Sequence, residues 1–497
     1  MSQPRRKFFV QTFGCQMNEH DSERLAGLLT ADGLERAAVP EEADVVVLNT
    51  CCVREKAVTR LYGRLGQLRE LKRDRPDVQI AVGGCLAQQD REGVLARAAH
   101  VDVVFGTHNL GRAPALLRRA AADGPVVEIV DHGGRDLHAG QVSPSPAGGP
   151  TLASPRDGSL APEAPGASVE DAMAPLAVRR DLPHAAWVAI QSGCNNTCSF
   201  CIVPSVRGGE VSRPFDEVLQ EVEALAGRGV VEITLLGQNV NSYGRDITRR
   251  RPLFADLLRA VGAVAGIQRV RFTSPHPKDL RPETIAAMAE TPAVCEHLHL
   301  PLQSGSNAVL TAMRRGYSVE RYMARLASAR AAIADLAVTT DLIVGFPGES
   351  DLDFDRTLEA VASAGYDSAY TFIFSPRPGT RAASMTERFV PQDVVRERFE
   401  ALVRLVERSA LRRNEARLHA HEEVIVEGRS KKDPSTWTGR TRQNKLVHFQ
   451  ADGAGAVGPG SRVTVVITSA SPHHLMGRLV DVSETPRSRL RIPVRSG

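Results

Sequence analysis

Short apolar segments alternate with amphipathic segments over the first 131 residues. The apolar segments are nearly continuous runs, which is typical of strands buried on both faces of a parallel sheet. The segments between them repeat hydrophobic residues at helical spacing. The pattern predicts an N-terminal doubly wound α/β domain over residues 5–131. The predicted strands are FFVQTFG (8–14), ADVVVLNT (43–50), VQIAVGG (78–84), VDVVFGT (101–107) and PVVEIVD (125–131).

The hydrophobic pattern stops at residues 132–184. Proline, glycine, alanine and serine dominate this stretch, which contains no Phe, Trp or Tyr. Such a composition buries too little apolar surface to offset the entropy lost on ordering. We therefore predict a flexible linker and assign it no chemistry.

A second series of apolar and amphipathic segments runs over residues 185–420. Its last helical segment, 396–420, is long and rich in arginine. Six successive βα units predict a partial (βα)6 barrel with its active site at the carboxyl ends of the strands. The predicted strands are WVAIQSG (187–193), VEITLLGQ (231–238), RVRFTS (269–274), HLHLPLQ (297–303), VTTDLIVGF (338–346) and AYTFIFS (369–375).

Alternating hydrophobicity with Gly-rich turns marks residues 421–485. That period is the period of a β-strand, and a segment of this length suits a small all-β barrel of the oligonucleotide-binding (OB) kind. The arginine-rich residues 486–497 are predicted to be a disordered basic tail.

Basic residues lie beside an aromatic residue in one strand-like part of this barrel. Arg440, Arg442 and Lys445 are followed closely by His448 and Phe449. Such a combination can track phosphates and stack a base. A solvated strand face explains the same charges nearly as well, so the pattern alone does not decide.

Length and composition are those of a globular protein with several domains. At 497 residues the chain has room for about three domains, and 42% of its residues are hydrophobic. No apolar run is long enough to span a bilayer, and the basic N-terminus lacks the apolar stretch of a secretory signal. We expect a cytoplasmic protein whose eight cysteines stay reduced and available to metal. The net charge of +4 permits an anionic partner without requiring one.

Three cysteines follow the first strand of the second series. Cys194, Cys198 and Cys201, here called the loop cysteines, are spaced C-x3-C-x2-C within GCNNTCSFCIVPSVRG. Thiolates hold iron–sulfur clusters, and three ligands on a four-iron cluster leave one iron open. A zinc site needs four ligands, commonly in two pairs, and no further pair lies nearby; chance spacing is the other alternative. The spacing favours a reactive iron–sulfur cluster.

Three further cysteines end the first three predicted strands. Cys15, Cys51 and Cys85, here called the N-terminal cysteines, are each separated by roughly one βα unit of 30 or more residues. Because ligands of open parallel sheets gather beyond the carboxyl ends of the strands, these thiols are expected to converge and hold a second cluster. Three unrelated buried cysteines are the alternative. Cys52 is expected to point away from Cys51 as a bystander, and Cys295 to be a core residue.

The order of these features resembles the radical S-adenosylmethionine (SAM) methylthiotransferase family. The C-x3-C-x2-C motif in a βα-repeat domain is similar to the motif of the radical SAM superfamily, and the C-terminal barrel resembles a TRAM domain, an RNA-binding module. The resemblance covers almost all of the chain except the predicted linker. The segments that carry it are TFGCQMNEHDSE, LNTCCVREKA, LLGQNVNSYG, FTSPHPKD, HLPLQSGSNAVLTAMRRGY, TTDLIVGFPGES and FSPRPGTRAA.

The resemblance implies a sulfur-group transferase. QMN (16–18) and REK (54–56) follow the branch that adds sulfur and a methyl group to C2 of N6-isopentenyladenosine at tRNA position 37, next to the anticodon. The branches that act on a ribosomal-protein aspartate or on threonylcarbamoyl-adenosine in tRNA are the alternatives, and a non-catalytic regulator is a more distant one. One departure bears on this choice, because Ser205 and Val206 stand where the first branch often has Tyr-Thr.

The resemblance also implies the cofactors and partners. Both sets of three cysteines would be catalytic, each holding one 4Fe–4S cluster. The loop cysteines would hold the cluster that binds and cleaves SAM, and the N-terminal cysteines the cluster that carries the sulfur, which a second SAM would methylate. The implied partners are the anticodon arm of tRNA, an electron donor such as ferredoxin or flavodoxin, and a sulfur source. We expect a monomer with no membrane partner.

Strand ends of the predicted barrel would line the SAM site. The candidates are Gln238, Asn239, Ser304, Asp341 and Gly345. The last of these opens a GFPGE turn that approximates the superfamily's glycine-rich adenine-binding strand end. An ordinary turn or core role explains each of the five about as well.

Overall fold

The computed structural model describes residues 5–52, 55–130, 182–451 and 457–485. The predicted linker lies outside the described residues except for its last three positions, and the predicted basic tail lies wholly outside them. The chain divides into two compact units. Unit 1 contains the N-terminal domain and Ile202–Gly208, and unit 2 contains the described residues 182–201 and those from Gly209 onward.

Unit 1 is built on a six-stranded parallel sheet in the order β2-β1-β3-β4-β5-β6. The two central strands are buried at every position, as the continuous apolar runs predicted. The strands are β1 (Lys7–Phe13), β2 (Glu35–Arg36), β3 (Val45–Thr50), β4 (Gln79–Gly83), β5 (Val103–Phe105) and β6 (Val126–Glu128).

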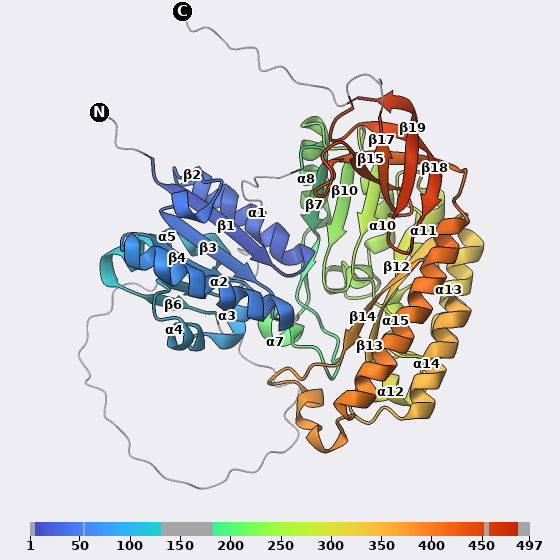
Figure 1. The fold of residues 1–497 in the computed structure, drawn as a ribbon, viewed down its shortest axis with the longest axis horizontal. Coiled ribbons are helices and arrows are strands. Elements are labelled where there is room, and N and C mark those ends of the chain that lie inside the picture. The colour runs from blue at the N-terminus through green and yellow to red at the C-terminus, as the bar shows by residue number, and fades with distance from the viewer. Residues whose placement is uncertain (1–4, 53–54, 131–181, 452–456, 486–497) are drawn as a thin grey trace, which may run out of the picture. The chain divides into compact units, whose positions relative to one another are not determined.

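Helices cover both faces of this sheet (Figure 1). Alternate residues of β3 show the two faces, because Val47 packs with α1 and α5 whereas Leu48 packs with α2, α3 and α4. The predicted doubly wound arrangement is therefore confirmed. The helices are α1 (Gln16–Ala31), α2 (Glu55–Asp74), α3 (Cys85–Asp90), α4 (Gly93–Arg97) and α5 (Ala113–Asp123).

One further short helix of unit 1 comes from the segment that follows the loop cysteines. This helix, α7 (Val203–Arg207), buries Ile202 and Val206 among the apolar residues of α2, α3 and α4. Thr107 Oγ1 donates a hydrogen bond of 2.8 Å to the carbonyl oxygen of Val206. The segment is thus an integral part of unit 1.

The core of unit 2 has six parallel strands in two sheets, ordered β11-β10-β7 and β12-β13-β14. A parallel bridge between Val270 and Val294 joins the end of the first sheet to the segment that leads into the second. The strands are β7 (Ala185–Ala189), β10 (Glu232–Leu236), β11 (Arg269–Phe272), β12 (His297–His299), β13 (Ala337–Val344) and β14 (Ser368–Ile373). Neighbours in sequence are neighbours in space, as the partial (βα)6 barrel predicted.

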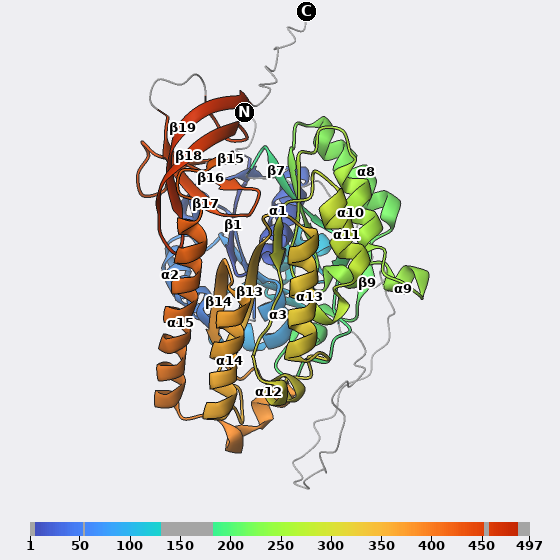
Figure 2. The ribbon, with the colours of Figure 1, turned by 90° about the vertical axis from the view of Figure 1, so that its right-hand side faces the viewer.

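Amphipathic helices separate these strands and share one apolar core with them. Figure 2 shows α13, α14 and α15 side by side along the outside of β13 and β14. Among the described residues, none of the helices combines the length and apolarity that crossing a membrane requires. The main helices are α8 (Phe215–Gly227), α10 (Phe254–Gly262), α11 (Pro282–Glu290), α13 (Val319–Ala332), α14 (Asp351–Ala364) and α15 (Gln392–Glu415).

The C-terminal part of unit 2 is a closed barrel in the order β15-β16-β17-β19-β18. Closure leaves no free sheet edge, and alternate residues such as Val424, Phe449 and Val465 fill the interior. The predicted all-β barrel is confirmed. Its strands are β15 (His421–Arg429), β16 (Trp437–Thr441), β17 (Leu446–Gln450), β18 (Arg462–Ala470) and β19 (Leu475–Glu484).

Candidate functional site

The N-terminal cysteines lie where three adjacent strands of unit 1 end. Cys15 follows β1, Cys51 follows β3, and Cys85 begins α3 directly after β4. Because β1, β3 and β4 are hydrogen-bonded neighbours, their carboxyl ends bring the three residues to one edge of the sheet. This placement agrees with the sequence analysis, and their role as cluster ligands stays a prediction.

The thiols at this edge pair with one another. A hydrogen bond with Cys51 is the main cause that lowers the pKa of Cys15 to about 6, against the effect of burial. A hydrogen bond between Cys52 and Cys85 lowers the pKa of Cys85 and raises the pKa of Cys52. Cys52 is therefore not a bystander. Because β3 ends at Thr50, Cys51 and Cys52 lie beyond the strand, where neighbouring side chains need not alternate.

Four thiols at one edge fit an iron–sulfur cluster. The deprotonated sulfur is the form that binds metal, and the irons of such a cluster are held by cysteine thiolates. Across the residues that the structure describes, no group of three or more His, Cys, Asp or Glu side chains is arranged to hold a single metal ion. Cysteine thiols at adjacent strand ends are the donor type that iron–sulfur clusters take, so the residues present fit such a cluster.

Two glycines allow the close approach of the segments that carry these cysteines. Gly14 has φ +148°, and a Cβ there would lie 2.4 Å from Cys51 Cβ. Gly84 has φ +94°, and a Cβ there would lie 2.2 Å from Asn49 Oδ1 and 2.8 Å from the Thr50 carbonyl oxygen. Only glycine accepts both this backbone conformation and this crowding.

Two buried asparagines fix the same edge, and sequence analysis gave them no role. Asn49 Nδ2 donates to the Asn18 carbonyl oxygen at 2.7 Å, and Asn18 Nδ2 donates to Asn49 Oδ1 at 3.3 Å. The thiol of Cys15 donates to Asn18 Oδ1 at 3.3 Å. These bonds tie the first turn of α1 to the end of β3. The signal in the sequence was a polar residue within the apolar run of β3.

The loop cysteines belong to unit 2 and lie on an irregular segment after β8 (Gln191–Ser192). Cys194 and Cys198 are buried, Cys201 is half-buried, and burial raises the pKa of Cys194. Main-chain bonds hold the segment, because Cys201 N donates to the Cys198 carbonyl oxygen at 3.1 Å and Ser199 N donates to that of Met313 at 3.0 Å. The loop is therefore shaped without regular structure.

A buried guanidinium touches one of the loop cysteines. Arg315 is 6% exposed, and its Nη1 donates to Cys198 Sγ at 3.3 Å. Its Nε donates to the Tyr317 hydroxyl at 3.2 Å, and that hydroxyl reaches the carbonyl oxygens of Pro301 and Leu302. A cation beside a ligand sulfur suits an anionic cluster. Sequence analysis included both residues in a family segment and assigned them no role.

Two of the five predicted SAM contacts have structural roles. Ser304 is fully buried, and its Oγ lies 3.3 Å from Thr357 Oγ1 and accepts a bond from Ser306 N at 3.2 Å. Gly345 has φ +73°, and a Cβ there would lie 2.6 Å from Val395 Cγ2. Packing inside unit 2 explains both residues without a ligand.

Of the other three predicted contacts, Gln238 and Asn239 keep polar atoms available, and Asp341 pairs with a histidine. In the described part of the chain, Gln238 Oε1 and Asn239 Oδ1 are buried and have no hydrogen-bond partner. Asn239 Nδ2 donates to Asp279 Oδ2 at 2.9 Å, and Asp341 Oδ2 lies 3.4 Å from His299 Nε2. A buried acceptor without a partner costs free energy until a donor reaches it. The amino groups of SAM are such donors, so these residues fit that ligand.

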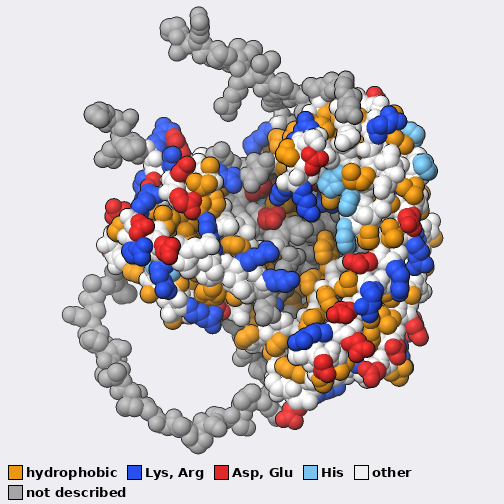
Figure 3. Space-filling model, viewed as in Figure 1, with side chains coloured by type: hydrophobic (Ala, Val, Ile, Leu, Met, Phe, Trp, Pro, Cys, Tyr) orange, Lys and Arg blue, Asp and Glu red, His pale blue; other side chains and the backbone are white. Residues whose placement is uncertain are grey.

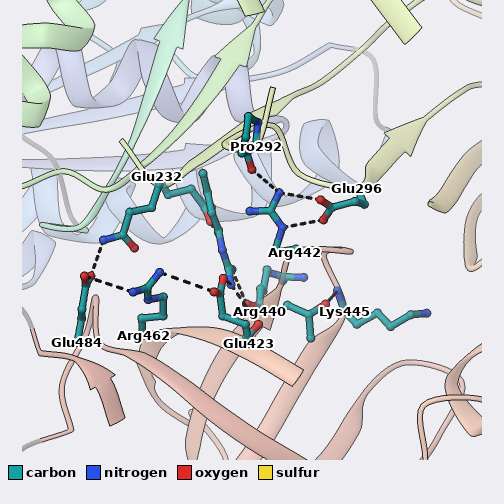
Figure 4. Close-up of polar contacts among 12 residues, drawn as sticks. Glu232, Pro292, Glu296, Glu423, Arg440, Arg442, Lys445, Arg462 and Glu484 are labelled. Atoms are coloured by element: carbon teal, nitrogen blue, oxygen red, sulfur yellow. Dashed lines mark hydrogen bonds and ion pairs between the residues drawn. The ribbon is translucent and has the colours of Figure 1, made fainter. Parts of the chain in front are cut away.

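Arg440, Arg442 and Lys445 form neither of the two arrangements that sequence analysis left open, a phosphate track or a solvated strand face (Figure 4). Arg442 donates from Nε and Nη2 to the Glu296 carboxylate at 2.7 and 2.8 Å, on the core of unit 2. Lys445 Nζ donates to Asp367 Oδ1 at 2.8 Å, with both side chains buried. Arg440 pairs with Glu427 at 2.9 Å, within the barrel itself. The charges are neutralised inside unit 2, which a charge pattern alone cannot show.

Arginines of the core complete this contact from the other side. Arg269, 1% exposed in its side chain, donates from Nη1 to the Arg440 carbonyl oxygen at 2.7 Å. Arg271 donates to the carbonyl oxygens of Thr441 and Arg442 at 2.8 and 2.9 Å. Charge-assisted bonds are stronger than neutral ones. They fix the turn between β16 and β17 on strand β11.

Another basic surface of the barrel is exposed. Lys431 and Lys432 lie in the turn after β15, and Arg429 stacks on Trp437 with Cζ 3.7 Å from the ring centroid. We call these four residues the turn patch. Figure 3 shows Lys and Arg side chains mixed with Asp and Glu over the face in view. The turn patch combines charged side chains with an aromatic ring. It can meet phosphate and base together.

Three family descriptions match successive parts of the chain. Residues 7–106 match the uncharacterized protein family UPF0004, residues 188–361 match the radical SAM superfamily, and residues 420–480 match the TRAM domain. The matches fall on the first five strands of unit 1, on the core of unit 2 from β7 to β13, and on the closed barrel.

Curated relatives match nearly the whole chain. The chain is 52% identical over 475 residues to the tRNA-2-methylthio-N(6)-dimethylallyladenosine synthase of Acidothermus cellulolyticus, covering 95% of this chain and 87% of the relative. It is 49% identical over 480 residues to the synthase of the same name from Thermobifida fusca, covering 96% and 89%.

A solved structure of similar fold is the radical S-adenosylmethionine methyltransferase TsrM from Kitasatospora setae. Its TM-score is 0.53 at 15% identity, with 76% of this chain and 74% of that chain covered. This likeness supports the fold of the core. The identity to the curated relatives goes further, and the chain belongs to the tRNA-2-methylthio-N(6)-dimethylallyladenosine synthase family of radical SAM enzymes.

Proposed function

We propose that the chain adds sulfur and a methyl group to C2 of N6-isopentenyladenosine, also called N6-dimethylallyladenosine, at position 37 of tRNA. The observation that carries this proposal is the identity of about half of all residues, over 95% of the chain, to relatives named for that product. The ranges matched by the three family descriptions contain both sets of cysteines and the barrel. tRNA is the proposed substrate, and the anticodon arm is the part that the barrel would bind.

The loop cysteines would hold a 4Fe–4S cluster whose open iron binds SAM. The C2–H bond of adenine is inert to side-chain acids and bases, and the cluster with SAM supplies the radical chemistry that this bond needs. The chain's own residues bind and orient these groups. Arg315 holds Cys198 through its hydrogen bond, and the acceptors of Gln238 and Asn239 would meet the donors of SAM.

The N-terminal cysteines would hold a second 4Fe–4S cluster, which carries the sulfur to be transferred. The support is their meeting at the ends of three adjacent strands, with thiol pairing and two obligatory glycines. An electron donor such as ferredoxin or flavodoxin, a separate sulfur source and a monomeric, cytoplasmic enzyme belong to the same proposal.

Anaerobic iron and sulfide analysis with EPR tests the two clusters. We expect about eight irons in the wild type and about four after either set of three cysteines is changed to alanine. Cys295→Ala is the matched control, because Cys295 is buried in the core of unit 2 and should leave the iron content unchanged. A wild type with about four irons, all lost with the loop cysteines, would remove the second cluster from the proposal.

Mass spectrometry of digested tRNA tests the substrate. tRNA that carries isopentenyladenosine but no methylthio group is incubated with reconstituted enzyme, SAM, sulfide and a reductant. We expect the methylthio nucleoside with the wild type and none with either triple variant. Modification of a ribosomal-protein aspartate with unchanged tRNA would contradict the proposed substrate.

A further inference from the structure

Arg207 lies buried beside one of the N-terminal cysteines. The residue is 5% exposed, and its Nε donates a hydrogen bond to Cys85 Sγ at 3.3 Å. Its Nη2 donates to Asp21 Oδ2 at 2.7 Å, and Asp21 is itself 7% exposed. A carboxylate, a guanidinium and a thiol therefore follow one another in the interior of unit 1.

The backbone of Arg207 is held in a fixed position by the packing of the helix that contains it. Arg207 ends α7, whose Val206 is buried among the apolar residues of α2 and α3 and accepts a hydrogen bond from Thr107. The next residue, Gly208, has φ +75° and ends the helix. The guanidinium thus reaches the sulfur from a fixed helix end, and its position does not depend on a flexible surface side chain.

A gain in folding stability is a weak explanation for the buried ion pair between Arg207 and Asp21. Removing two charges from water costs several kcal/mol for each ion in real proteins, so a buried ion pair is often no better than apolar residues of the same size. Hydrogen bonds to ligand sulfurs and the net charge around a cluster, by contrast, set its reduction potential. A cation favours the reduced cluster, which carries one more negative charge, and a nearby carboxylate opposes it.

We propose that Arg207 is a positioning residue for the cluster on the N-terminal cysteines: it holds Cys85 through Nε, and its charge, partly balanced by Asp21, raises the reduction potential of that cluster. The inference rests on the proposed function, because it presupposes a cluster at this site. It also means that the segment starting directly after the last loop cysteine, Cys201, supplies the cation of the other site.

The test isolates the N-terminal site. All variants are made in the chain whose loop cysteines are changed to alanine, so that the remaining iron belongs to the N-terminal cysteines. The cluster is titrated with dithionite at controlled potential and followed by EPR. Arg207→Gln should lower the midpoint potential and Asp21→Asn should raise it. Arg207→Lys keeps the charge and should lie closer to the wild type than Arg207→Gln does.

The opposite signs separate electrostatic tuning from loosened packing. If the ion pair only tied α7 to α1, both changes would loosen the site in the same direction. Arg213→Gln is the matched control, because Arg213 is also 5% exposed and pairs with Glu221 at 2.7 Å, but in unit 2. Its midpoint potential should equal that of the parent chain.

Each outcome has one meaning. Equal potentials in the Arg207→Gln, Asp21→Asn and parent proteins, at equal iron content, would overturn the role of Arg207. If Arg207→Gln does not fold, Asp21→Asn decides, and a potential that is unchanged or lowered overturns the inference. A parent chain without iron would instead show that the N-terminal cluster of the proposed function is absent.

Discussion

Glu296 of the six-stranded core accepts two hydrogen bonds from the guanidinium of Arg442 in the barrel, at 2.7 and 2.8 Å. The same Nη2 also donates to the carbonyl oxygens of Pro292 and Val294. About a quarter of each charged side chain is exposed. The contact joins two parts of unit 2 that sequence comparison describes as separate domains.

Arg442→Gln should weaken the attachment of the barrel to the core. A hydrogen bond to a charged group contributes about 1.5–3 kcal/mol, and partial exposure places this pair at or below the lower end. Hydrogen exchange of the β16–β17 turn at Thr441 should become faster, while the salt dependence of tRNA binding stays as in the wild type. A smaller salt slope would show instead that Arg442 meets a phosphate.

Changing Lys431 and Lys432 to alanine should weaken tRNA binding and its salt dependence. Each phosphate contact contributes about 0.7–0.9 to the slope of log K against log salt, so the double variant should lose up to about twice that amount. Trp437→Ala should weaken binding by about 1–3 kcal/mol at all salt concentrations, because base stacking depends little on salt. Filter binding from 50 to 200 mM salt measures both, and Arg442→Gln serves as the control.

Gly84→Ala should cost iron at the N-terminal site, whereas Gly33→Ala should not. Both glycines have a positive φ, +94° and +92°, so alanine strains the backbone at both positions. Only at Gly84 would the new methyl group meet Asn49 and the Thr50 carbonyl oxygen, since nothing lies within 4 Å of a Cβ at Gly33. We expect both variants to be destabilised by about 1–3 kcal/mol. Equal iron contents would show that Cys85 tolerates the displacement.

His276 should make the cluster-free protein less stable below about pH 6.5. Burial, with Arg315, Lys278 and Arg325 nearby, lowers the pKa of His276 to about 2. Above the unfolded pKa the ring is neutral in both states. Below it, only the unfolded state binds the proton, so stability falls by up to about 1.4 kcal/mol per pH unit.

Urea unfolding between pH 7.5 and 5 tests this dependence. His276→Asn keeps an acceptor for the Lys278 N–H, which now donates to Nδ1 at 3.2 Å, and should remove that part of the pH dependence. His473→Asn is the control for replacing a histidine with asparagine, because the side chain of His473 is 74% exposed. Identical profiles for wild type and His276→Asn would contradict the prediction.

Periodic and local signals in the sequence predicted most of the fold. The buried strands of unit 1 are continuous apolar runs, and the strand ends at Cys15, Cys51 and Cys85 follow from where those runs stop. Cys52 was misjudged because the alternation of a strand was extended past Thr50, where β3 has ended. The alternation of side chains predicted for a strand applies only to the residues within that strand.

Contacts between distant residues could not be predicted in the same way. Arg207 and Cys85 are 122 positions apart, and Arg315 and Cys198 are 117 apart. No helix or strand periodicity relates positions so far apart in the sequence. An isolated arginine is usually a surface residue, so neither arginine is expected to be buried. Lys445 is a further example. The sequence of a basic strand segment does not show whether its side chains face solvent or, as Lys445 does, form an ion pair with Asp367.

The carbonyl oxygens that meet Arg269 and Arg271 have a consequence for exchanging domains. These acceptors belong to the main chain at Arg440, Thr441 and Arg442, so these particular bonds depend on the path of the turn and not on the identity of its side chains. A chimera with a foreign barrel should work only if its turn has the same length. One residue inserted in the turn would leave a buried guanidinium without its acceptor, which costs free energy. The barrel therefore cannot be exchanged freely between proteins.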